Sequence, residues 1–354
     1  MTQSPSNTHE FDSDQLDIED RAAFEAYLLE TDRAKPGDLA SHKVLAGGVS
    51  SRAVLATFTD GRAWVLKQSL AKLRVPGDWF SDPSRVHREA LGMQTLGELC
   101  PTGAIPKLIF DDERHHVLAM EAVLEPHENW KTMLLRGEVD HDHVAEFGRL
   151  LGGIHGKSFA GCEQLPEAFA DRSFFESLRL HPYYEVSAVN EPRAAAFYER
   201  LLADTRAQKL SLVHGDYSPK NVLVRNGKLV LLDHEVIHIG DPAFDVGFAL
   251  THLLSKAHHL PKLRERFADA ALVFWDDYSL IARFFGLEKV MPVERCVRHA
   301  LGCLLARVVG RSPLEYLSGE ERERQCEAVV RLMAEPPIDV YDLADRFVEE
   351  IERD

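Results

Sequence analysis

The sequence predicts an α+β protein with a small β-rich amino-terminal part and a larger, mainly helical carboxy-terminal part. Short apolar runs separated by turn residues occupy Val44 to Gln68. A tight hairpin is predicted around Asn226-Gly227. After Phe244, apolar residues recur at helical spacing along most of the chain. With 354 residues and 45% hydrophobic content, the chain can form two parts of unequal size.

The amino-terminal part is expected to begin with antiparallel strands. Residues 44–58 read as a strand start, a glycine break and a second strand, and Asp60-Gly61 then turns into a third strand, Ala63–Gln68. Glycine backbone and Ser hydroxyls can approach a phosphate closely, although a plain hairpin explains the same residues. The candidate nucleotide-binding residues in this break are Gly48, Ser50 and Ser51.

A cation and an acid stand on the apolar faces of the next two elements. Period-two alternation puts Lys67 on one strand face with Ala63 and Val65, where an anionic partner is expected. Asp82-Pro83 marks a helix start, and the helix carries Glu89 on its apolar stripe. Lys67 and Glu89 are therefore candidates for a pair, and a strand-edge Lys with a solvated Glu is the alternative.

The hairpin at Asn226-Gly227 determines the register of its two strands. This turn pair accepts positive φ at both positions and closes a two-residue loop. Val222 then faces Leu231, and Asn221 faces Leu232, next to Asp233. Asn221 and Asp233 are expected to lie roughly 5 Å apart across the ladder.

The residues at this end of the hairpin suit phosphoryl transfer. An Asn carbonyl oxygen and an Asp carboxylate are hard ligands of the kind that Mg²⁺ combines with phosphate oxygens. Asp216, five residues before Asn221, can accept a hydrogen bond from an incoming hydroxyl. Each residue alone has an ordinary structural explanation, and the joint spacing of Asp216, Asn221 and Asp233 carries the prediction.

The stretch from His214-Gly215-Asp216 to Asp233 resembles the catalytic core of the small-molecule kinases related to aminoglycoside phosphotransferases, choline kinase and methylthioribose kinase. Protein kinases carry His-Arg-Asp in that loop and a Lys two residues after the Asp, where this chain has Ser218. A protein acceptor is therefore disfavoured. Val65-Leu66-Lys67-Gln68, with residues 74–79 downstream, resembles methylthioribose kinase more than it resembles the antibiotic kinases.

The resemblance implies a two-lobed protein-kinase-like fold that uses ATP and Mg²⁺. It implies an amino-terminal nucleotide lobe at 18–120, a hinge at 121–128 and a catalytic lobe at 129–354, while composition predicts an acidic, disordered tail at 1–17. Lys67 would reach the nucleotide phosphates and Glu89 would position it. Residues 116–123 would run into the hinge, although a plain core strand fits them too. The residues expected near the adenine are Met120, Glu121 and Val123.

Within the catalytic lobe, the resemblance assigns Asp216 as the catalytic residue and Asn221 and Asp233 as metal ligands. Supporting roles fall to His214 and to two later acids. Glu235 is expected to assist the metal or the acceptor, and Asp245 to brace the catalytic loop. Helices are predicted at 144–155, 263–285, 293–309, 320–333 and 341–351.

Composition excludes several other classes of protein. The net charge is −16, and it disfavours binding to a nucleic-acid backbone. Residues 1–20 contain six acids and residues 342–354 another six, against two Arg in all, so most of the excess charge lies in the two ends. Five scattered cysteines fit reduced thiols. No stretch resembles a membrane span or a signal peptide, and a cytoplasmic location is expected.

The predicted function is transfer of the γ-phosphate of ATP to a hydroxyl of a small molecule. An aminoglycoside-, methylthioribose- or choline-like acceptor remains open, as does the oligomeric state. The alternative is a catalytically silent kinase fold that serves as a nucleotide-sensing or interaction module. Aromatic residues that could line an acceptor site, or simply fill the core, are Phe174-Phe175 and Tyr183-Tyr184.

Overall fold

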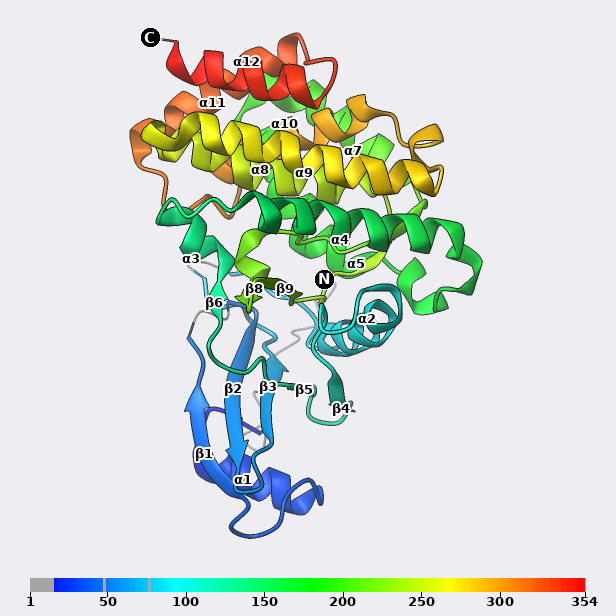
Figure 1. Ribbon diagram of the computed structural model, residues 1–354, viewed down its shortest axis with the longest axis vertical. Helices are drawn as coiled ribbons and strands as arrows, with labels where there is room; N and C mark the ends of the chain where they lie inside the picture. The colour runs from blue at the N-terminus through cyan, green and yellow to red at the C-terminus, as the bar shows by residue number, and fades with distance from the viewer. Residues whose placement is uncertain (1–15, 47–48, 76–77, 354) are drawn as a thin grey trace, which may run out of the picture. The chain divides into compact units, whose positions relative to one another are not determined.

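The computed structural model of the chain describes residues 16–46, 49–75 and 78–353. They form two compact units, labelled by element in Figure 1. The first unit runs to Val86 and includes Ile109–Ala122, and the second comprises His87–Leu108 and the chain from Val123. The expected α+β class is confirmed. The predicted bounds differ from these units in placing residues 87–108 with the amino-terminal part.

The first unit is built on an antiparallel sheet with strand order β1-β2-β3-β5-β4. Helix α1 contributes Phe24 and Leu28 to the core on one face, where they meet Val54 and Leu66 of the sheet. Among the described residues of the predicted tail, Leu16 is tied to this unit because its carbonyl accepts from Gln68 Nε2 at 2.7 Å. The elements are α1 (Arg21–Glu30), β1 (Leu39–Val44), β2 (Ser51–Phe58), β3 (Ala63–Ser69), β4 (Leu108–Asp112) and β5 (Val117–Glu121).

Alternation along β3 follows the sequence-based prediction. Trp64 and Leu66 are buried, whereas Val65 and Lys67 are half-buried on the opposite face. Residues two positions apart lie on the same face of a strand, so Lys67 shares a face with Ala63 and Val65, as predicted. The Asp60-Gly61 turn joins β2 to β3, with Gly61 at φ +89°.

The second unit is mainly helical. The helices predicted near 293–309 and 320–333 are confirmed at Val293–Val309 and Gly319–Ala334. The other predicted helices appear with similar bounds. The main elements are α2 (Arg85–Leu99), β6 (Glu128–Asn129), α3 (Trp130–Leu135), α4 (His141–Ala160), α5 (Ser173–Phe175), η3 (Glu176–Glu185), α6 (Val186–Asn190), α7 (Ala195–Ala207), β7 (Ser211–Val213), η5 (Pro219–Asn221), β8 (Val222–Arg225), β9 (Lys228–Leu231), β10 (His238–Gly240), α8 (Ala243–His259), α9 (Arg264–Phe284), α10 (Val293–Val309), α11 (Gly319–Ala334) and α12 (Val340–Glu352).

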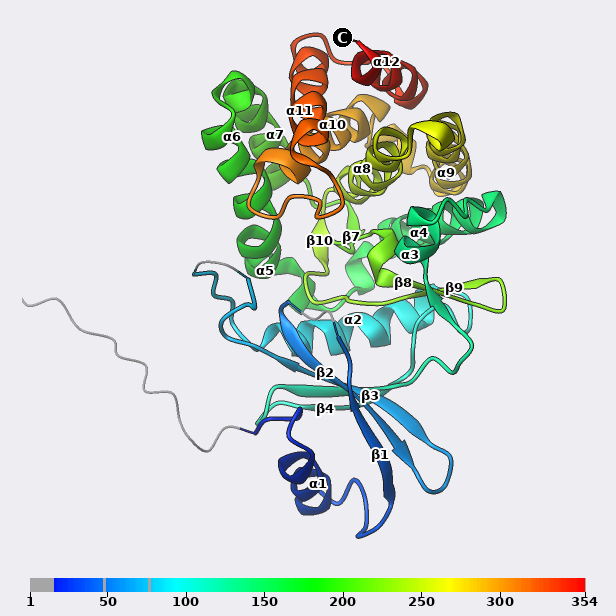
Figure 2. The ribbon, with the colours of Figure 1, turned by 90° about the vertical axis from the view of Figure 1, so that its left-hand side faces the viewer.

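Helices α4, α8 and α9 run side by side in the core of this unit (Figures 1 and 2). Glycines let α4 approach α9 closely. A Cβ atom at Gly148 would lie 2.5 Å from the carbonyl oxygen of Phe274, and one at Gly152 would lie 2.9 Å from that of Tyr278. Such distances are far shorter than van der Waals contact. The close packing of α4 and α9 therefore depends on glycine, which has no Cβ, at both positions.

Two features bear on the broader predictions. The five cysteines are all free, as expected for reduced thiols. None of the helices in the described part of the chain has the length and apolar character needed to cross a bilayer.

Candidate active site

The β8–β9 hairpin brings Asn221 next to the residues that precede Asp233. Val222 pairs with Leu231, as predicted, and the Leu232 N–H donates to the Asn221 carbonyl at 2.9 Å. Asn226 and Gly227 have φ values of +52° and +70°, the conformation expected for the two-residue turn. The predicted hairpin and its register are confirmed.

Asp233 itself has an unusual backbone. Its φ of +68° lies in the left-handed region, which costs energy for a residue with a Cβ. Backbone strain of this kind persists where surrounding structure enforces it, and it is common at binding sites. The chain turns sharply here from β9 into the buried segment that contains Glu235.

Asp216 is buried among three polar side chains. Its Oδ2 lies 3.0 Å from Arg179 Nη2 and 3.0 Å from Lys220 Nζ, and it accepts from Asn221 Nδ2 at 2.8 Å. Only 1% of Asp216 is exposed. The other carboxylate oxygen, Oδ1, is buried and has no hydrogen-bond partner among the described residues. One oxygen is therefore held in place while the other remains available to a ligand.

The charges around Asp216 keep it ionised. Burial alone would raise the pKa of this carboxyl group, but the charges of Arg179 and Lys220 outweigh burial and lower the pKa below its ordinary value. Asp216 is therefore a carboxylate at neutral pH and can accept a proton.

Arg179 comes from a helix of unusual geometry. It lies in η3, a π-helix of ten residues, and is 7% exposed. Its Nε donates to the Gly215 carbonyl at 2.8 Å, so the same guanidinium contacts both the backbone and the carboxylate of the catalytic loop. Sequence reasoning missed Arg179. The only local signal is a cation between Leu178 and Leu180, and nothing in that pattern points to Asp216.

His214 connects the loop at residues 214–216 to the strand end at Leu232. The Asp216 N–H donates to His214 Nδ1 at 3.2 Å, so the proton of a neutral ring is on Nε2, which faces the Leu232 carbonyl at 3.2 Å. Burial lowers the pKa of His214, which favours this neutral form. Asp216 and Leu232 are therefore linked through one imidazole ring.

Gly215 is required by the shape of the loop. Its φ is +77°, and a Cβ there would lie 2.8 Å from Val236 Cγ2. A side chain at this position would be strained and would also clash. The His-Gly-Asp form of the motif thus has a steric reason in this chain.

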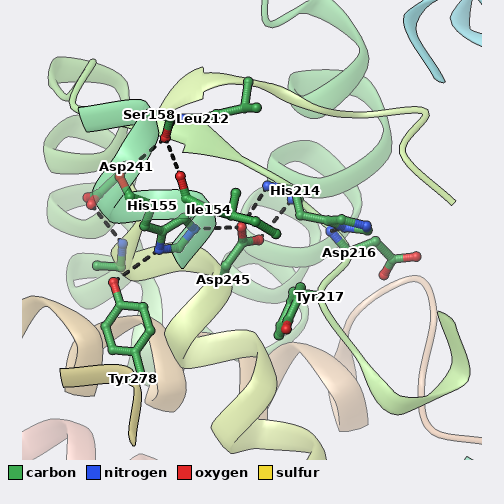
Figure 3. Close-up of polar contacts among 12 residues, drawn as sticks. Ile154, His155, Ser158, Leu212, His214, Asp216, Tyr217, Asp241, Asp245 and Tyr278 are labelled. Atoms are coloured by element: carbon green, nitrogen blue, oxygen red, sulfur yellow. Dashed lines mark hydrogen bonds and ion pairs between the residues drawn. The ribbon is translucent and has the colours of Figure 1, made fainter. Parts of the chain in front are cut away.

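Asp245 fixes the backbone of the same loop (Figure 3). This residue lies in the first turn of α8 and is completely buried. Its carboxylate accepts from the backbone N–H of His214 at 2.6 Å and of Gly215 at 2.8 Å. Its Oδ2, which accepts from His214, also lies 3.1 Å from Nε2 of His155, and Nδ1 of the same ring lies 3.0 Å from the hydroxyl of Tyr278. A buried network from α4, α8 and α9 therefore holds the loop rigid.

The donor set near the hairpin suits a hard cation that also binds phosphate. Asn221 Nδ2 donates to both the carbonyl and Oδ2 of Asp216, which orients the amide and leaves its Oδ1 for another partner. Asp233 and Glu235 supply carboxylates nearby in sequence. No cluster of three or more His, Cys, Asp or Glu residues suited to a metal occurs in the described ranges. Mg²⁺ does not require one, since it commonly takes one or two carboxylates with phosphate oxygens and water.

The candidate nucleotide residues of the first unit are less fully placed. Gly48 lies outside the described residues. Ser51 begins β2, and its buried Oγ has no hydrogen-bond partner within the described part of the chain. Ser50 contributes its carbonyl to Arg85 Nη2. Lys67 and Glu89 belong to different units, so their pairing stays a prediction. The candidate hinge residues lie at the carboxy-terminal end of β5, with Met120 and Glu121 in the strand and Val123 two residues after it.

Comparison with known proteins identifies the family. Residues 41–284 match the phosphotransferase enzyme family, APH, over more than half of the chain. The chain belongs to this family. The predicted relationship to this family is therefore confirmed.

Related sequences in this phosphotransferase family include two named methylthioribose kinases. The protein from Pectobacterium atrosepticum is 26% identical over 264 residues, which cover 64% of each chain. The protein from Yersinia enterocolitica is 26% identical over 322 residues, which cover 74% of this chain and 79% of the relative. The chain thus matches less than two thirds of the length of the Pectobacterium relative.

Solved structures show the same fold at low sequence identity. An amicoumacin kinase in complex with AMP-PNP, Ca²⁺ and its ligand has a TM-score of 0.56 and 12% identity, covering 92% of this chain and 99% of the other. An aminoglycoside phosphotransferase in complex with GDP and kanamycin has a TM-score of 0.53 and 13% identity, covering 88% and 97%. These likenesses confirm the predicted kinase-like fold.

Proposed function

We propose that this phosphotransferase moves the γ-phosphate of ATP to a hydroxyl of a small molecule. The observation that carries the proposal is the geometry of Asp216, a buried carboxylate with one oxygen held by Arg179, Lys220 and Asn221 and the other without a partner among the described residues. Family membership and the relatives named methylthioribose kinase support the same reaction class.

In the proposed reaction, the acceptor hydroxyl donates a hydrogen bond to Asp216 Oδ1. The acceptor oxygen forms a bond to the γ-phosphorus, the bond from that phosphorus to the bridging oxygen of ADP breaks, and the hydroxyl proton passes to Asp216. Arg179 and Lys220 keep the carboxylate ionised beforehand, and Asp245 keeps the loop backbone in place. Most of the rate enhancement then comes from alignment and from charge neutralisation.

Asn221 and Asp233 would hold Mg²⁺, with Glu235 as a further oxygen donor to the metal or the acceptor. When bound, the ion would neutralise charge on the nucleotide phosphates. The buried setting of Glu235 and the left-handed backbone of Asp233 support a dedicated role for this segment.

The first unit would bind the nucleotide. Lys67 would contact the phosphates and Glu89 would position it, while Ser50, Ser51 and the stretch from Met120 to Val123 would contact the phosphates and the base. Support for this part comes from the family membership and from the position of Lys67 on the half-buried face of β3.

An acceptor screen tests the proposed function. ATP consumption should be measured across a panel of sugars, amino alcohols, aminoglycosides and generic protein acceptors, together with the thermal shift caused by Mg²⁺ and a non-hydrolysable ATP analogue. The proposal expects phosphorylation of at least one small molecule and none of the proteins. Nucleotide binding without turnover on any of the panel would contradict it and favour a silent nucleotide-sensing module.

A further inference from the structure

A row of basic side chains extends from Asp216 through the interior of the helical unit. It begins at Arg179, whose guanidinium lies 3.0 Å from Asp216 and 5.8 Å from the ring centroid of Tyr183. Arg307 of α10 lies over the same ring at 5.5 Å, and its Nη1 donates to the Tyr183 hydroxyl at 3.3 Å. Tyr183 is therefore close to two guanidinium groups, one of which contacts the proposed catalytic carboxylate.

The row extends along one face of α8. Phe248 stacks on Tyr183 with 5.9 Å between centroids, and His252 packs edge-on against Phe248 at 4.8 Å. One turn further, Lys256 donates from Nζ to the His252 carbonyl at 2.9 Å. Positions 248, 252 and 256 are each four residues apart and so share a helix face.

The row returns toward the catalytic loop through Tyr316 and α3. Lys256 Nζ lies 5.4 Å from the Tyr316 ring centroid and Lys131 Nζ lies 5.9 Å from it. Lys131 is the second residue of α3, whose N-cap is Asn129, and Asn129 Nδ2 donates to the Lys220 carbonyl at 2.7 Å. The members are hereafter called the basic cluster: Lys131, Arg179, Lys220, His252, Lys256 and Arg307.

Two cations of the basic cluster, Lys256 and Arg307, form no ion pair with a carboxylate within the described part of the chain. Asp216 offsets Arg179 and Lys220, and Glu315 pairs with Lys131. Among the described residues, no carboxylate lies within 4.0 Å of Lys256 or Arg307. Lys256 is fully buried and Arg307 is 8% exposed. Glu315 acts on Lys256 only at longer range, and Arg307 Nη1 donates to the carbonyl and the hydroxyl of Ser312, so the basic cluster still carries more positive than negative charge and can accept an anion.

Polar atoms without partners point to the same conclusion. His252 and Arg307 are both more than nine-tenths buried. Among the residues described, His252 Nε2 and Arg307 Nε have no hydrogen-bond partner. Burial, followed by the charge of Lys131, lowers the pKa of Lys256 to about 7, and the charges of Lys256 and Arg307 add to the effect of burial in lowering the pKa of His252. An anion bound here would reverse both shifts.

We propose that the basic cluster binds an anionic group, a phosphate or a carboxylate, carried by the acceptor molecule. This inference rests on the proposed function and narrows its substrate class to hydroxylated compounds with negative charge. The net charge of the whole chain, −16, would instead suggest a cationic acceptor, but the side chains that form ion pairs with Asp216 are the cations Arg179 and Lys220. A cationic aminoglycoside or amino alcohol would be repelled by Arg307 and by the protonated form of Lys256.

The first test measures anion binding without requiring turnover. Inorganic phosphate and acetate are titrated at constant ionic strength against the wild type and the variants Lys256→Met and Arg307→Gln, which remove charge and keep most of the side-chain volume. Arg149→Gln is the matched control, since Arg149 pairs with Asp277 at the exposed surface of the α4–α9 pair. Melting temperatures without added anion show that each variant is folded.

The wild type and Arg149→Gln should bind at least one of the two anions, and each cluster variant should bind it about tenfold more weakly. Tighter binding of phosphate would indicate an acceptor with a phosphate group, and tighter binding of acetate an acceptor with a carboxylate. Folded Lys256→Met and Arg307→Gln proteins with wild-type anion affinity would overturn the inference, and if one variant fails to fold the other still decides.

The second test uses matched acceptor pairs, such as ribose with ribose 5-phosphate and glucose with gluconate. The anionic member of a pair should have a kcat/KM at least about tenfold higher, and Lys256→Met should remove this preference. Phosphorylation that prefers neutral or cationic acceptors would overturn the inference and leave the proposed function intact. Cluster-dependent anion binding with no phosphorylation of any acceptor would overturn the proposed function and support an anion site.

Discussion

At the scale of single residues, Arg179 determines the protonation state of Asp216. It is the first charge that opposes the effect of burial on this carboxyl group. Arg179→Gln should therefore raise the Asp216 pKa, and the acid limb of the pH profile of kcat/KM should move to higher pH with it. Arg179→Lys should restore part of the shift, because it returns the charge without the planar guanidinium.

The control for this prediction is Arg149→Gln, which removes a surface cation of the same unit. Its pH profile should match the wild type. An acid limb that stays in place in Arg179→Gln, with reduced turnover at every pH, would show that Arg179 acts only through the structure of the loop.

Asp112 gives a residue-scale prediction about stability. Burial acts to raise its pKa, but hydrogen bonds from Tyr27 and Arg33, at 2.8 Å each, outweigh burial and hold the pKa well below its ordinary value. A depressed folded pKa means that the stabilisation is present above the unfolded pKa of about 3.9 and is lost as the pH falls below it. Asp112→Asn should lower the free energy of unfolding by about 2 kcal/mol at neutral pH.

Denaturant unfolding of the Asp112→Asn variant at neutral and at acidic pH checks this sign. The difference from the wild type should shrink as the pH falls, since Asp112 then becomes protonated in both states of the wild type. Glu30→Gln, at the exposed end of α1, should unfold like the wild type at both pH values. If the difference in unfolding free energy between the wild type and Asp112→Asn grew toward acidic pH, the low pKa of Asp112 would be contradicted.

At the scale of elements, local sequence patterns predicted the hairpin and the later helices well. Asn226-Gly227 specifies its own turn, so the pairing of Val222 with Leu231 followed without any tertiary information. The π-helix η3 could not be predicted in this way, because its pattern is short and includes Pro182. Its position depends on contacts distant in sequence, such as the one from Arg179 to Gly215. The role of Arg179 beside Asp216 was missed for that reason.

The packing of α4 against α9 gives an element-scale prediction with a control in the same helix. Gly152→Ala should lower the free energy of unfolding by about 1–3 kcal/mol, because the new methyl group would meet the Tyr278 carbonyl and Ile281. Gly153 has no atom within 4 Å of an added Cβ. Gly153→Ala should raise stability by up to about 1 kcal/mol through helix propensity. Thermal unfolding of both variants tests the pair, and equal losses would show that backbone effects, not the contact with α9, explain the result.

At the scale of the whole molecule, the sequence indicated two parts with different tasks and a reaction class, but not the chemistry of the acceptor. The net charge says little about the charge of the acceptor, since most of the excess acid lies near the two ends of the chain. The basic cluster could not be found from sequence because its members come from five separated segments: α3, η3, η5, α8 and α10. Only the folded helical unit brings Lys256 and Arg307 into line with Asp216.

The central claim is that Asp216 accepts the proton of the acceptor hydroxyl, and Asp216→Asn tests it most directly. The measurement pairs turnover of an acceptor found in the screen with the affinity for Mg²⁺ and a non-hydrolysable ATP analogue, and it uses Asp204→Asn, an exposed acid of α7, as the control. The account predicts that Asp216→Asn lowers kcat by about 10²–10⁴-fold while nucleotide affinity stays near the wild-type value. Substantial turnover in this variant, with nucleotide affinity unchanged, would contradict the account.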